Sequence, residues 1–337
     1  MSAIMSPADD SLTPFHKLAP EVILDAVEST GLRCSGHISA LNSYENRVYQ
    51  IGIEDELPII AKFYRPDRWT DDAITEEHEL TATLAEYEIP VIAPLIREGL
   101  TLFHSGPFRF ALYPRVGGRA PELDDPEHLV QLGRCIARIH NIGSISSFKH
   151  RPRIDIDSFV IRPREFLLQH GFIPTDLSAS YDALMEAVIR SLEGHMRIYN
   201  EVVQLRLHGD SHVGNILWYN NTPSLVDFDD ARMGPSIQDL WMLLSGDREY
   251  MRARLHDLLD GYCEFREFDA RELYLIESLR TMRMVHHAGW LAQRWDDPAF
   301  PGAFPWFNTQ RYWEEHILYL KEQLSMMEEP PLEWQAD

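Results

Sequence analysis

The stretch that decides the fold of this chain is His208-Gly209-Asp210-Ser211-His212-Val213-Gly214-Asn215, followed twelve residues later by Asp227-Phe228-Asp229. Phosphoryl transfer from a nucleotide requires one carboxylate that accepts a hydroxyl proton. It also requires an amide oxygen and a second carboxylate that hold Mg²⁺ against the phosphates. The two motifs contain these three groups. We therefore predict that Asp210 and Asp227 are catalytic and that Asn215 and Asp227 are the metal ligands.

The segment between the two motifs is typical of a β-hairpin. An apolar and aromatic run, 216–219, is followed by the turn residues 220–223, and the chain then runs into Asp227. A hairpin of this size returns Asp227 to the side of Asn215, so that two ligands distant in sequence face one metal ion. Asp210 and Asn215 also stand five residues apart, which is the spacing of Asp and Asn in the protein-kinase catalytic loop. The combination predicts a kinase.

Two other interpretations use the same residues. A solvated surface loop would also contain Asp, Asn, Gly and His, because these residues are common in turns. His208, Asp210 and His212 alternate, so on an extended strand they would share a face and could bind Zn²⁺ or Fe²⁺ as in a metallohydrolase. This metallohydrolase interpretation assigns no role to Asn215 or Asp227 and names no further histidine ligand, which favours the kinase.

Composition predicts a globular, cytoplasmic protein. The chain has 337 residues, 45% apolar and 25% charged, which is enough for two lobes with a sizeable core. It contains no run of eighteen apolar residues and no basic-then-apolar N-terminus, so we expect neither a membrane span nor secretion. The scattered cysteines Cys34, Cys135 and Cys263 indicate reduced thiols. A net charge of −22 argues against binding to nucleic acid or anionic membranes, because phosphates would be repelled.

Residue periodicity predicts an α+β chain with a bilobal protein-kinase-like fold, in which a small β-rich N-terminal lobe joins a larger helical C-terminal lobe. The nucleotide-binding lobe is expected at residues 16–116, and the helical lobe, with the catalytic loop and the metal site, at residues 117–327. Residues 1–15 and 328–337 are expected to be flexible tails. The expected strands are 47–53, 58–64, 91–96, 100–104 and 108–114. One helix is expected to begin near Pro20 and another to precede His140. Further helices are expected at 71–87, 181–203 and 270–295.

The β-rich lobe contains a lysine that is expected to contact the nucleotide. Lys62 is the one cation in the apolar strand Ile59-Ile60-Ala61-Lys62-Phe63. Its surroundings resemble the kinase strand whose lysine pairs with the α- and β-phosphates and with a helix glutamate. We expect Glu77, on the following helix, to be that partner, with Glu76 and Glu79 as alternatives. An exposed strand lysine and a solvated helix face are the ordinary explanations for such residues.

A turn takes the place of the glycine-rich loop of other kinases. No Gly-x-Gly-x-x-Gly motif precedes the strand pair, and Leu41-Asn42-Ser43-Tyr44-Glu45-Asn46-Arg47 stands there instead. The Ser43 hydroxyl and the backbone amides of such a turn can donate hydrogen bonds to phosphates, so Ser43 is expected to bind the nucleotide. Tyr113-Pro114-Arg115-Val116 lies where a hinge between lobes would run, and its backbone is expected beside the adenine.

These motifs resemble the aminoglycoside phosphotransferase and choline-kinase-like branch of the protein-kinase superfamily, whose signatures include His-Gly-Asp-x-x-x-x-Asn and Asp-Phe-Asp. Within that branch, the chain is similar to the bacterial stress response kinase A group from about residue 16 to Pro331. The segments that carry this similarity are 41–49, Lys62-Phe63-Tyr64-Arg65-Pro66, Gly117-Gly118-Arg119, Asp239-Leu240-Trp241-Met242-Leu243-Leu244 and Asp297-Pro298-Ala299-Phe300-Pro301.

The resemblance implies a cytoplasmic kinase of the bacterial stress response that uses Mg²⁺ and ATP and transfers the γ-phosphoryl group to Ser or Thr hydroxyls of proteins. Its partners would be ATP and a protein substrate, with no nucleic acid and no membrane, and we expect a monomer. Two alternatives stay open: a kinase for a small alcohol such as choline, homoserine or an aminoglycoside, and a pseudokinase that only binds nucleotide. Retention of Lys62, Asp210, Asn215 and Asp227 argues against the pseudokinase.

Further positions have expected supporting roles. Asp239 resembles the helix acid that braces the catalytic loop from beneath, and His208 is expected to support the same loop from a buried position. Asp229 stands in place of the usual glycine and is expected to cap the loop rather than to approach the metal. Core or solvated-face positions are expected for a helical group made of Arg280, Arg283, His286 and His287.

Overall fold

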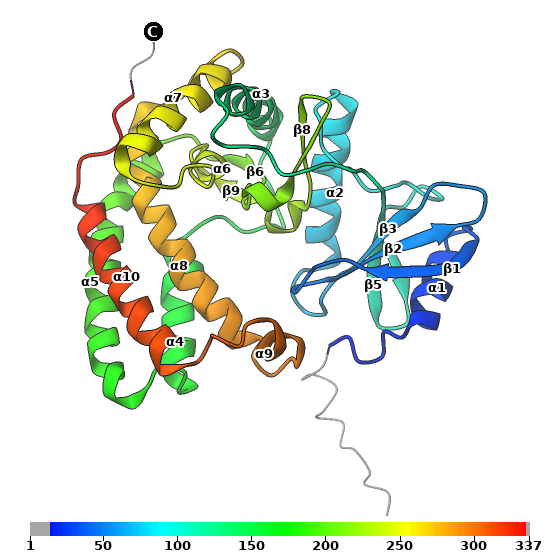
Figure 1. Cartoon of the computed structure of the whole chain (residues 1–337), viewed down its shortest axis with the longest axis horizontal. Helices are drawn as coiled ribbons and strands as arrows, with labels where there is room; N and C mark the ends of the chain where they lie inside the picture. The colour runs from blue at the N-terminus through cyan, green and yellow to red at the C-terminus, as the bar shows by residue number, and fades with distance from the viewer. Residues whose placement is uncertain (1–13, 335–337) are drawn as a thin grey trace, which may run out of the picture.

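The protein folds into two lobes, as the sequence predicts. In the computed structural model, which describes residues 14–334, a β-sheet with two helices forms the first lobe and a helical body forms the second (Figure 1). The predicted α+β architecture, with a small β-rich first lobe and a larger helical second lobe, is therefore confirmed. Residues 1–13 and 335–337 of the expected tails lie outside the described residues.

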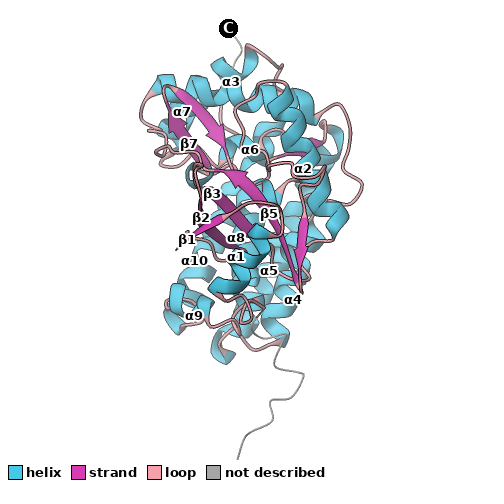
Figure 2. Ribbon diagram, turned by 90° about the vertical axis from the view of Figure 1, so that its right-hand side faces the viewer, coloured by secondary structure: helices cyan, strands magenta, loops and turns pink. Residues whose placement is uncertain are grey.

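Five antiparallel strands form the sheet of the first lobe: β1 (Cys34–Ala40), β2 (Arg47–Ile53), β3 (Ile59–Phe63), β4 (Phe103–Ser105) and β5 (Phe108–Pro114). Their spatial order is β1-β2-β3-β5-β4. Figure 2 looks onto this lobe and shows the strands in front of the helical body. The strand β1 was not predicted, because it is an edge strand whose residues are half-buried or exposed and lack strict alternation.

The strand predicted at 91–96 is wrong. Val91 forms only an isolated bridge with Leu225, and no named strand covers this segment. Pro90 lies directly before this segment and Pro94 lies within it. Proline lacks a backbone N–H, so each interrupts the ladder that a sheet strand needs.

Two helices accompany the sheet, α1 (Pro20–Glu28) and α2 (Asp71–Glu86). The helix α2 begins where Thr70 accepts a hydrogen bond from the backbone N of Ala73 at 3.2 Å. One face of α2 is buried, and this face includes Glu77 and His78 among apolar residues. The helix lies between the sheet and the helical lobe (Figure 1), where it contacts α3 and the 3₁₀ turn Phe228–Asp230 of that lobe.

The helical lobe contains two antiparallel strand pairs and eight α-helices within the described residues. Two glycines allow α3 and α7 to pack closely: a Cβ on Gly133 would lie 2.0 Å from the carbonyl O of Leu258, and one on Gly261 would lie 1.9 Å from that of Val130. The elements are α3 (Pro126–Gly143), α4 (Arg162–Gln169), α5 (Thr175–Glu201), α6 (Gln238–Trp241), α7 (Arg248–Cys263), α8 (Ile276–Gln293), α9 (Ala299–Ala303), α10 (Gln310–Met327), the pair β6 (Leu205–Leu207) with β9 (Arg232–Gly234), and the pair β7 (Ile216–Tyr219) with β8 (Thr222–Leu225).

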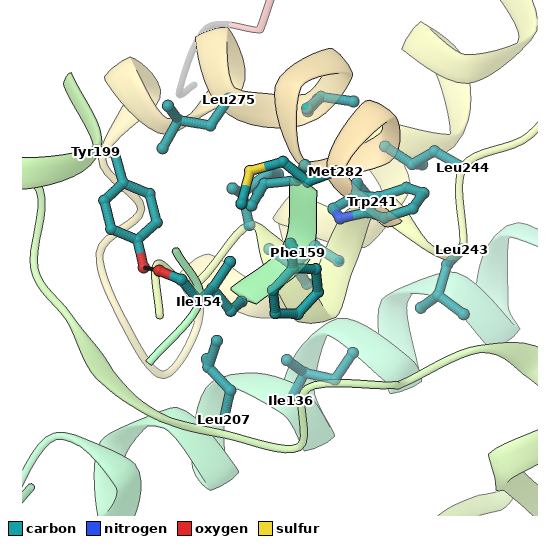
Figure 3. Packing of buried hydrophobic residues seen from close by; sticks show 14 of the residues in the cluster. Ile136, Ile154, Phe159, Tyr199, Leu207, Trp241, Leu243, Leu244, Leu275 and Met282 are labelled. Carbon is teal, nitrogen blue, oxygen red and sulfur yellow. Dashed lines mark hydrogen bonds between the residues drawn. The ribbon is translucent and has the colours of Figure 1, made fainter. Parts of the chain in front are cut away.

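One large apolar core holds this lobe together (Figure 3). Ile136 of α3, Leu207 of β6 and Met282 of α8 meet there, although they are far apart in the sequence. Two polar groups drawn among them are satisfied: the Tyr199 hydroxyl donates a hydrogen bond to the carbonyl O of Ile154 at 2.6 Å, and Trp241 Nε1 donates to Gln238 Oε1 at 3.2 Å. The segments predicted to be catalytic are therefore attached to a well-packed base.

Residues 328–334 of the predicted C-terminal tail lie against the helical lobe. Leu332 is buried, and the ring of Trp334 lies 5.8 Å from that of Phe268. The guanidinium of Arg248 donates a hydrogen bond to the carbonyl O of Pro331 at 2.6 Å. Two large apolar side chains in a short stretch are enough to hold it against the helical lobe.

Among residues 14–334, no helix combines the length and the apolar character needed to cross a bilayer.

A buried acid in the 3₁₀ segment Ala270–Leu275 makes stability depend on pH. The Glu272 carboxylate accepts hydrogen bonds from Ile237 N at 2.8 Å and from Ser236 Oγ at 3.1 Å, but burial raises its pKa from 4.5 to about 7. Because the folded-state pKa lies above the unfolded one, this group's stabilising contribution is complete below pH 4.5. It is lost as the pH rises through 7, a change of about 3 kcal/mol.

We therefore expect Glu272→Gln to raise the free energy of unfolding relative to the wild type more at pH 8 than at pH 5. Urea unfolding at both pH values measures this difference. The amide replaces one acceptor oxygen with a donor, and that cost is the same at both pH values. An equal effect at pH 5 and pH 8 would show that Glu272 does not titrate in this range.

Candidate active site

The catalytic-loop stretch is held from beneath by the buried Asp239 of α6. Its two carboxylate oxygens accept hydrogen bonds from the backbone N of His208 and of Gly209, each at 2.8 Å, and the Ser211 hydroxyl donates to its carbonyl at 2.6 Å. His140 of α3 lies 3.1 Å from the same carboxylate. Burial alone would raise the pKa of Asp239, but these contacts hold it below its ordinary value. The predicted bracing role is confirmed.

Both ring nitrogens of the buried His208 are used inside the loop. Nε2 lies 2.9 Å from the carbonyl O of Val226, and Nδ1 lies 3.2 Å from the backbone N of Asp210. No ring nitrogen is left to bind a metal ion. Moreover, residues 14–334 contain no group of three or more His, Cys, Asp or Glu side chains arranged to hold one. The metallohydrolase interpretation is therefore wrong, and His208 supports the loop as predicted.

Gly209 brings the catalytic loop against the Asp-Phe-Asp segment. Its φ is +85°, and a Cβ at this position would lie 2.2 Å from the carbonyl O of Asp230. Both conditions require glycine. The glycine of the His-Gly-Asp motif thus sets the distance between the two segments that carry Asp210 and Asp227.

The predicted hairpin is present and brings Asp227 beside Asn215. Its strands β7 and β8 pair antiparallel, with Ile216 opposite Leu225, and Val226 N then donates to the carbonyl O of Asn215 at 3.0 Å. The Asn215 side-chain N donates to the carbonyl O of Asp210 at 2.9 Å, which orients the amide. Asp227 itself has a left-handed backbone with φ 60°, a conformation that is uncommon outside glycine and is often found at functional sites.

Lys62 joins the sheet to these acids. Its Nζ lies 2.7 Å from Asp227 Oδ1 and 3.3 Å from Asp229 Oδ1. Burial alone would lower the pKa of Lys62, but the two carboxylates outweigh it and raise the pKa well above its usual value, so the ammonium stays charged. Asp229 also pairs with Arg68. It is therefore bound to two cations and does not cap the loop, which corrects our expectation.

The predicted ion pair between Lys62 and Glu77 is not formed within the described residues. Glu77 Oε2 instead lies 2.9 Å from Nη2 of Arg151, and both side chains are almost completely buried. Burial raises the pKa of Glu77 to about 7, although Lys62 and Arg151 oppose this. Arg151 comes from the segment after α3, so no local pattern could have indicated it as the partner.

The alternatives Glu76 and Glu79 do not contact Lys62 either. The Glu76 carboxylate accepts hydrogen bonds from the backbone N of Lys149, His150 and Arg151 at 2.6, 2.8 and 3.0 Å, and Glu79 is exposed. Two consecutive acids of α2 thus attach this helix to the helical lobe, one through backbone amides and the other through a guanidinium.

All of the predicted site residues line one cavity of about 820 Å³ between the lobes. Ser43 lies in the turn before β2, where its hydroxyl donates to the carbonyl O of Asn46 at 3.0 Å. One end of the cavity is apolar and reaches the expected hinge, whereas the other end reaches α8. The predicted residues in its lining are Ser43, Lys62, Glu77, Asp210, Asn215 and Asp227, and the apolar end is lined by Val48, Ile60, Ile92, Tyr113, Pro114, Val116, Leu217 and Val226.

The acids of the cavity suit a divalent cation. Oxygen atoms of carboxylates and amides are the ligands that Mg²⁺ prefers. Asp229 Oδ1 is buried and accepts no hydrogen bond from the described residues, although the Lys62 ammonium lies 3.3 Å from it. Asn215, whose amide nitrogen is already engaged by Asp210, keeps its oxygen available. Asn215 and Asp227, with Asp229 nearby, would hold such an ion, and nucleotide phosphates would complete the coordination.

The contact between Arg283 of α8 and Asp210 was not predicted from the sequence. Its Nη1 lies 2.5 Å from Asp210 Oδ1, and His212 Nε2 lies 3.5 Å from Oδ2. Burial would raise the pKa of Asp210, but His212 and Arg283 lower it below its ordinary value. We expected Arg283, His286 and His287 in the core or on a solvated face; all three line the cavity, where Arg283 and His286 are half-buried and His287 is exposed. Their helical spacing indicated that they share one face of the helix, but it did not indicate which part of the protein lies opposite that face.

The profile of the phosphotransferase enzyme family matches residues 37–275, which is most of the chain. The chain belongs to this phosphotransferase family. The phosphotransferase is 43% identical to stress response kinase A of Escherichia coli O157:H7 over 96% of this chain and 98% of that protein. It is 41% identical, with the same coverage, to the serine/threonine protein kinase RdoA of Salmonella typhimurium strain LT2.

A solved structure shares the fold of this phosphotransferase. It is amicoumacin kinase hAmiN in complex with AMP-PNP, Ca²⁺ and Ami, with a TM-score of 0.70, 18% identity, and coverage of 94% of this chain and 97% of that one. At this identity the likeness concerns the fold.

Proposed function

We propose that this phosphotransferase is a Mg²⁺- and ATP-dependent kinase that transfers the γ-phosphoryl group to Ser or Thr hydroxyls of proteins in a bacterial stress response. The observation that carries the proposal is the meeting of Lys62, Asp210, Asn215 and Asp227 in one cavity between two lobes. The protein acceptor and the stress response are supported by the names of relatives that are 41–43% identical to this chain.

The nucleotide would occupy the cavity from the hinge to the catalytic loop. Its adenine would lie at the apolar end, beside Tyr113 and Val116, and the Lys62 ammonium and the Ser43 turn would bind its phosphates. Glu77 would act through Arg151 to hold α2 at the back of the site. Mg²⁺, when bound by Asn215 and Asp227, would neutralise negative charge on the β- and γ-phosphates. The AMP-PNP and Ca²⁺ in the amicoumacin kinase structure support this use of nucleotide and divalent ion.

Asp210 would act as the general base. Its pKa lies below the ordinary value, so it is ionised at neutral pH and can accept the acceptor's hydroxyl proton. The hydroxyl oxygen then forms the new bond to the γ-phosphorus, and the bond to the β-phosphate oxygen breaks as ADP leaves. The backbone bonds from His208 and Gly209 to Asp239 keep the loop in position during this step.

Asp227→Ala should weaken binding of the Mg²⁺–nucleotide complex, because it removes a metal ligand and a partner of Lys62. We expect a loss of affinity of about tenfold or more for Mg²⁺–ATP, and a smaller loss for ATP in EDTA. Titration calorimetry with and without Mg²⁺ measures both. An unchanged affinity for Mg²⁺–ATP would contradict the metal assignment.

A transfer assay with radiolabelled ATP and Mg²⁺ tests the proposal. It would offer proteins of acidic and basic composition, a panel of small alcohols, and no acceptor, to the wild type and to Asp210→Asn. An acid-stable label on protein that is lost in the variant would support a Ser/Thr protein kinase. Label on small alcohols alone would overturn the protein acceptor, and tight ATP binding without any transfer would indicate a pseudokinase.

A small-molecule kinase is the second candidate. The observation that favours it is the overall similarity of fold to amicoumacin kinase. In addition, the rings of Tyr44 and Phe304 lie 4.8 Å apart and connect the two lobes beside the α8 end of the cavity, which limits the size of an acceptor there. The panel of alcohols in the assay above separates this candidate from a protein kinase.

A further inference from the structure

The end of the cavity beyond Asp210 has a wall made by one face of α8. Arg283, His287 and Trp290 stand four and three residues apart, so they share this face, and all three line the cavity. The nucleotide is assigned to the opposite end, and Asp210 lies between the two. The acceptor must therefore bring its hydroxyl to Asp210 from the α8 side. We call this face, Arg283, His287 and Trp290, the acceptor wall.

The carboxylate of Glu45, which borders the acceptor wall from the sheet lobe, is already neutralised. Its oxygens lie 2.7 and 2.9 Å from the guanidinium nitrogens of Arg294, 3.3 Å from Arg65, and also accept a hydrogen bond from Trp290 Nε1. Arg68, whose guanidinium lies 3.8 Å from Oε1, together with Arg294 and Arg65 holds the pKa of Glu45 below the ordinary value despite burial. Glu45 is therefore not free to bind a cationic acceptor.

The acids on the other border are occupied as well. Asp230 lies 2.8 Å from Arg68 and 2.7 Å from Arg232, and Asp229 pairs with Arg68 and Lys62. Asp210 itself is needed for the hydroxyl proton. A cationic amino alcohol would thus meet no unpaired carboxylate among the described residues near the acceptor wall.

Arg283, in contrast, keeps donors for a ligand. Its side chain is 40% exposed, and within the described residues its charged partner is Asp210, which engages one terminal nitrogen. A guanidinium has five N–H donors in a planar fork that matches a carboxylate or phosphate. His286, which also lines the cavity, stacks on Phe159 and is neutral at pH 7 because burial lowers its pKa to about 3. Arg283 is therefore the cation that an acceptor would meet beside the base.

We propose that Arg283 determines acceptor specificity by binding an anionic group next to the reacting hydroxyl, so that the substrate is a Ser or Thr in an acidic peptide segment. This inference rests on the proposed protein-kinase function and names its substrate class. An anionic group would form a charge-assisted, two-point contact with Arg283. It would also draw the guanidinium away from Asp210 Oδ1, which frees that oxygen for the hydroxyl proton. A cation beside the hydroxyl would be repelled.

The test compares peptides that contain one Ser flanked by Glu, Gln or Lys, with kcat/KM measured at saturating Mg²⁺–ATP. We expect the wild type to prefer the Glu peptide over the Lys peptide by about tenfold or more, as one charge-assisted contact allows. Arg283→Gln should remove this preference, and Arg283→Glu should reverse it. Arg283→Lys should keep it in weaker form, because an ammonium cannot make the two-point contact.

Arg190→Glu is the matched control. Arg190 is an exposed residue of α5, paired at 3.9 Å with Glu186. Its substitution by Glu changes the net charge of the protein by the same amount as Arg283→Glu. It should leave the preference unchanged. A wild-type preference for the Lys peptide, or the same preference in the wild type and in Arg283→Gln, would overturn the proposal.

The same assay separates this inference from the proposed function. Glycerate, glycerol and aminopropanol serve as anionic, neutral and cationic small alcohols. If no peptide is labelled but glycerate is preferred and the preference depends on Arg283, the protein acceptor is wrong and the role of Arg283 stands. If peptides are labelled without regard to charge, the protein kinase stands and the role of Arg283 is wrong.

Discussion

Replacing Asp210 by Asn should reduce phosphoryl transfer by on the order of a hundredfold or more while leaving nucleotide binding nearly unchanged. The amide has almost the same shape as the carboxylate but cannot accept the hydroxyl proton. Asp239 holds the loop through backbone groups of its neighbours, so the substitution should not move it. Initial rates of transfer and the Kd for ATP, measured on the same preparation, give the two quantities.

Asp260→Asn is the control for this experiment. Asp260 is a half-exposed acid of α7 that pairs with His256 at 3.2 Å and lies outside the cavity lining. Its loss changes the net charge by the same amount and should leave transfer unaffected. Near-normal activity in Asp210→Asn would remove Asp210 from the role of base.

Arg151→Ala should destabilise the folded protein by roughly 3–5 kcal/mol, because it leaves a buried charge without its partner. The Arg151 guanidinium contacts Glu77 at 2.9 Å and donates hydrogen bonds to the carbonyl O of Ala73, Asp229 and Ala231 at 2.7, 2.8 and 3.0 Å. These acceptors belong to α2 and to the Asp-Phe-Asp segment. Urea unfolding measures the loss, and nucleotide affinity should fall in parallel because both segments border the cavity.

A second substitution separates lost charge pairing from lost packing. Glu77→Gln in the Arg151→Ala background removes the stranded carboxylate, so it should recover part of the lost stability. The pKa of Glu77 is already raised to about 7 by burial, so the single variant should be least stable above that pH. Arg153→Ala, at an exposed position two residues on, should cost little. Equal costs at positions 151 and 153 would contradict this account.

Residue spacing was sufficient for the parts of the site that lie within short segments. The interval from Asp210 to Asn215, the hairpin that follows, and the apolar strand around Lys62 are each local patterns. The structure brings Lys62, Asp210, Asn215 and Asp227 to one cavity. Most strands and helices were predicted for the same reason, whereas 91–96 was wrong because Pro90 and Pro94 outweighed an apolar pattern.

The ion-pair partners could not be predicted in this way. Lys62 and Asp227 are 165 residues apart, Glu77 and Arg151 are 74 apart, and Glu45 and Arg294 are 249 apart. We expected Glu77 beside Lys62 because the two residues pair in other kinases. In this protein the Glu77 carboxylate pairs with Arg151 instead. Arg283 was assigned to the core or to solvent because helical periodicity identifies a face without indicating what it contacts.

The amino-acid sequence by itself thus determined the fold class, the secondary structure around the cleft and the chemical groups that the site contains, since these depend on propensity and spacing along the chain. Only the tertiary structure decided which acidic side chain pairs with which basic side chain. In a buried cleft an unpaired charge is costly, so each acid is bound by the cation that packing of the two lobes brings within reach. That choice depends on distances in space, which the order of residues does not contain.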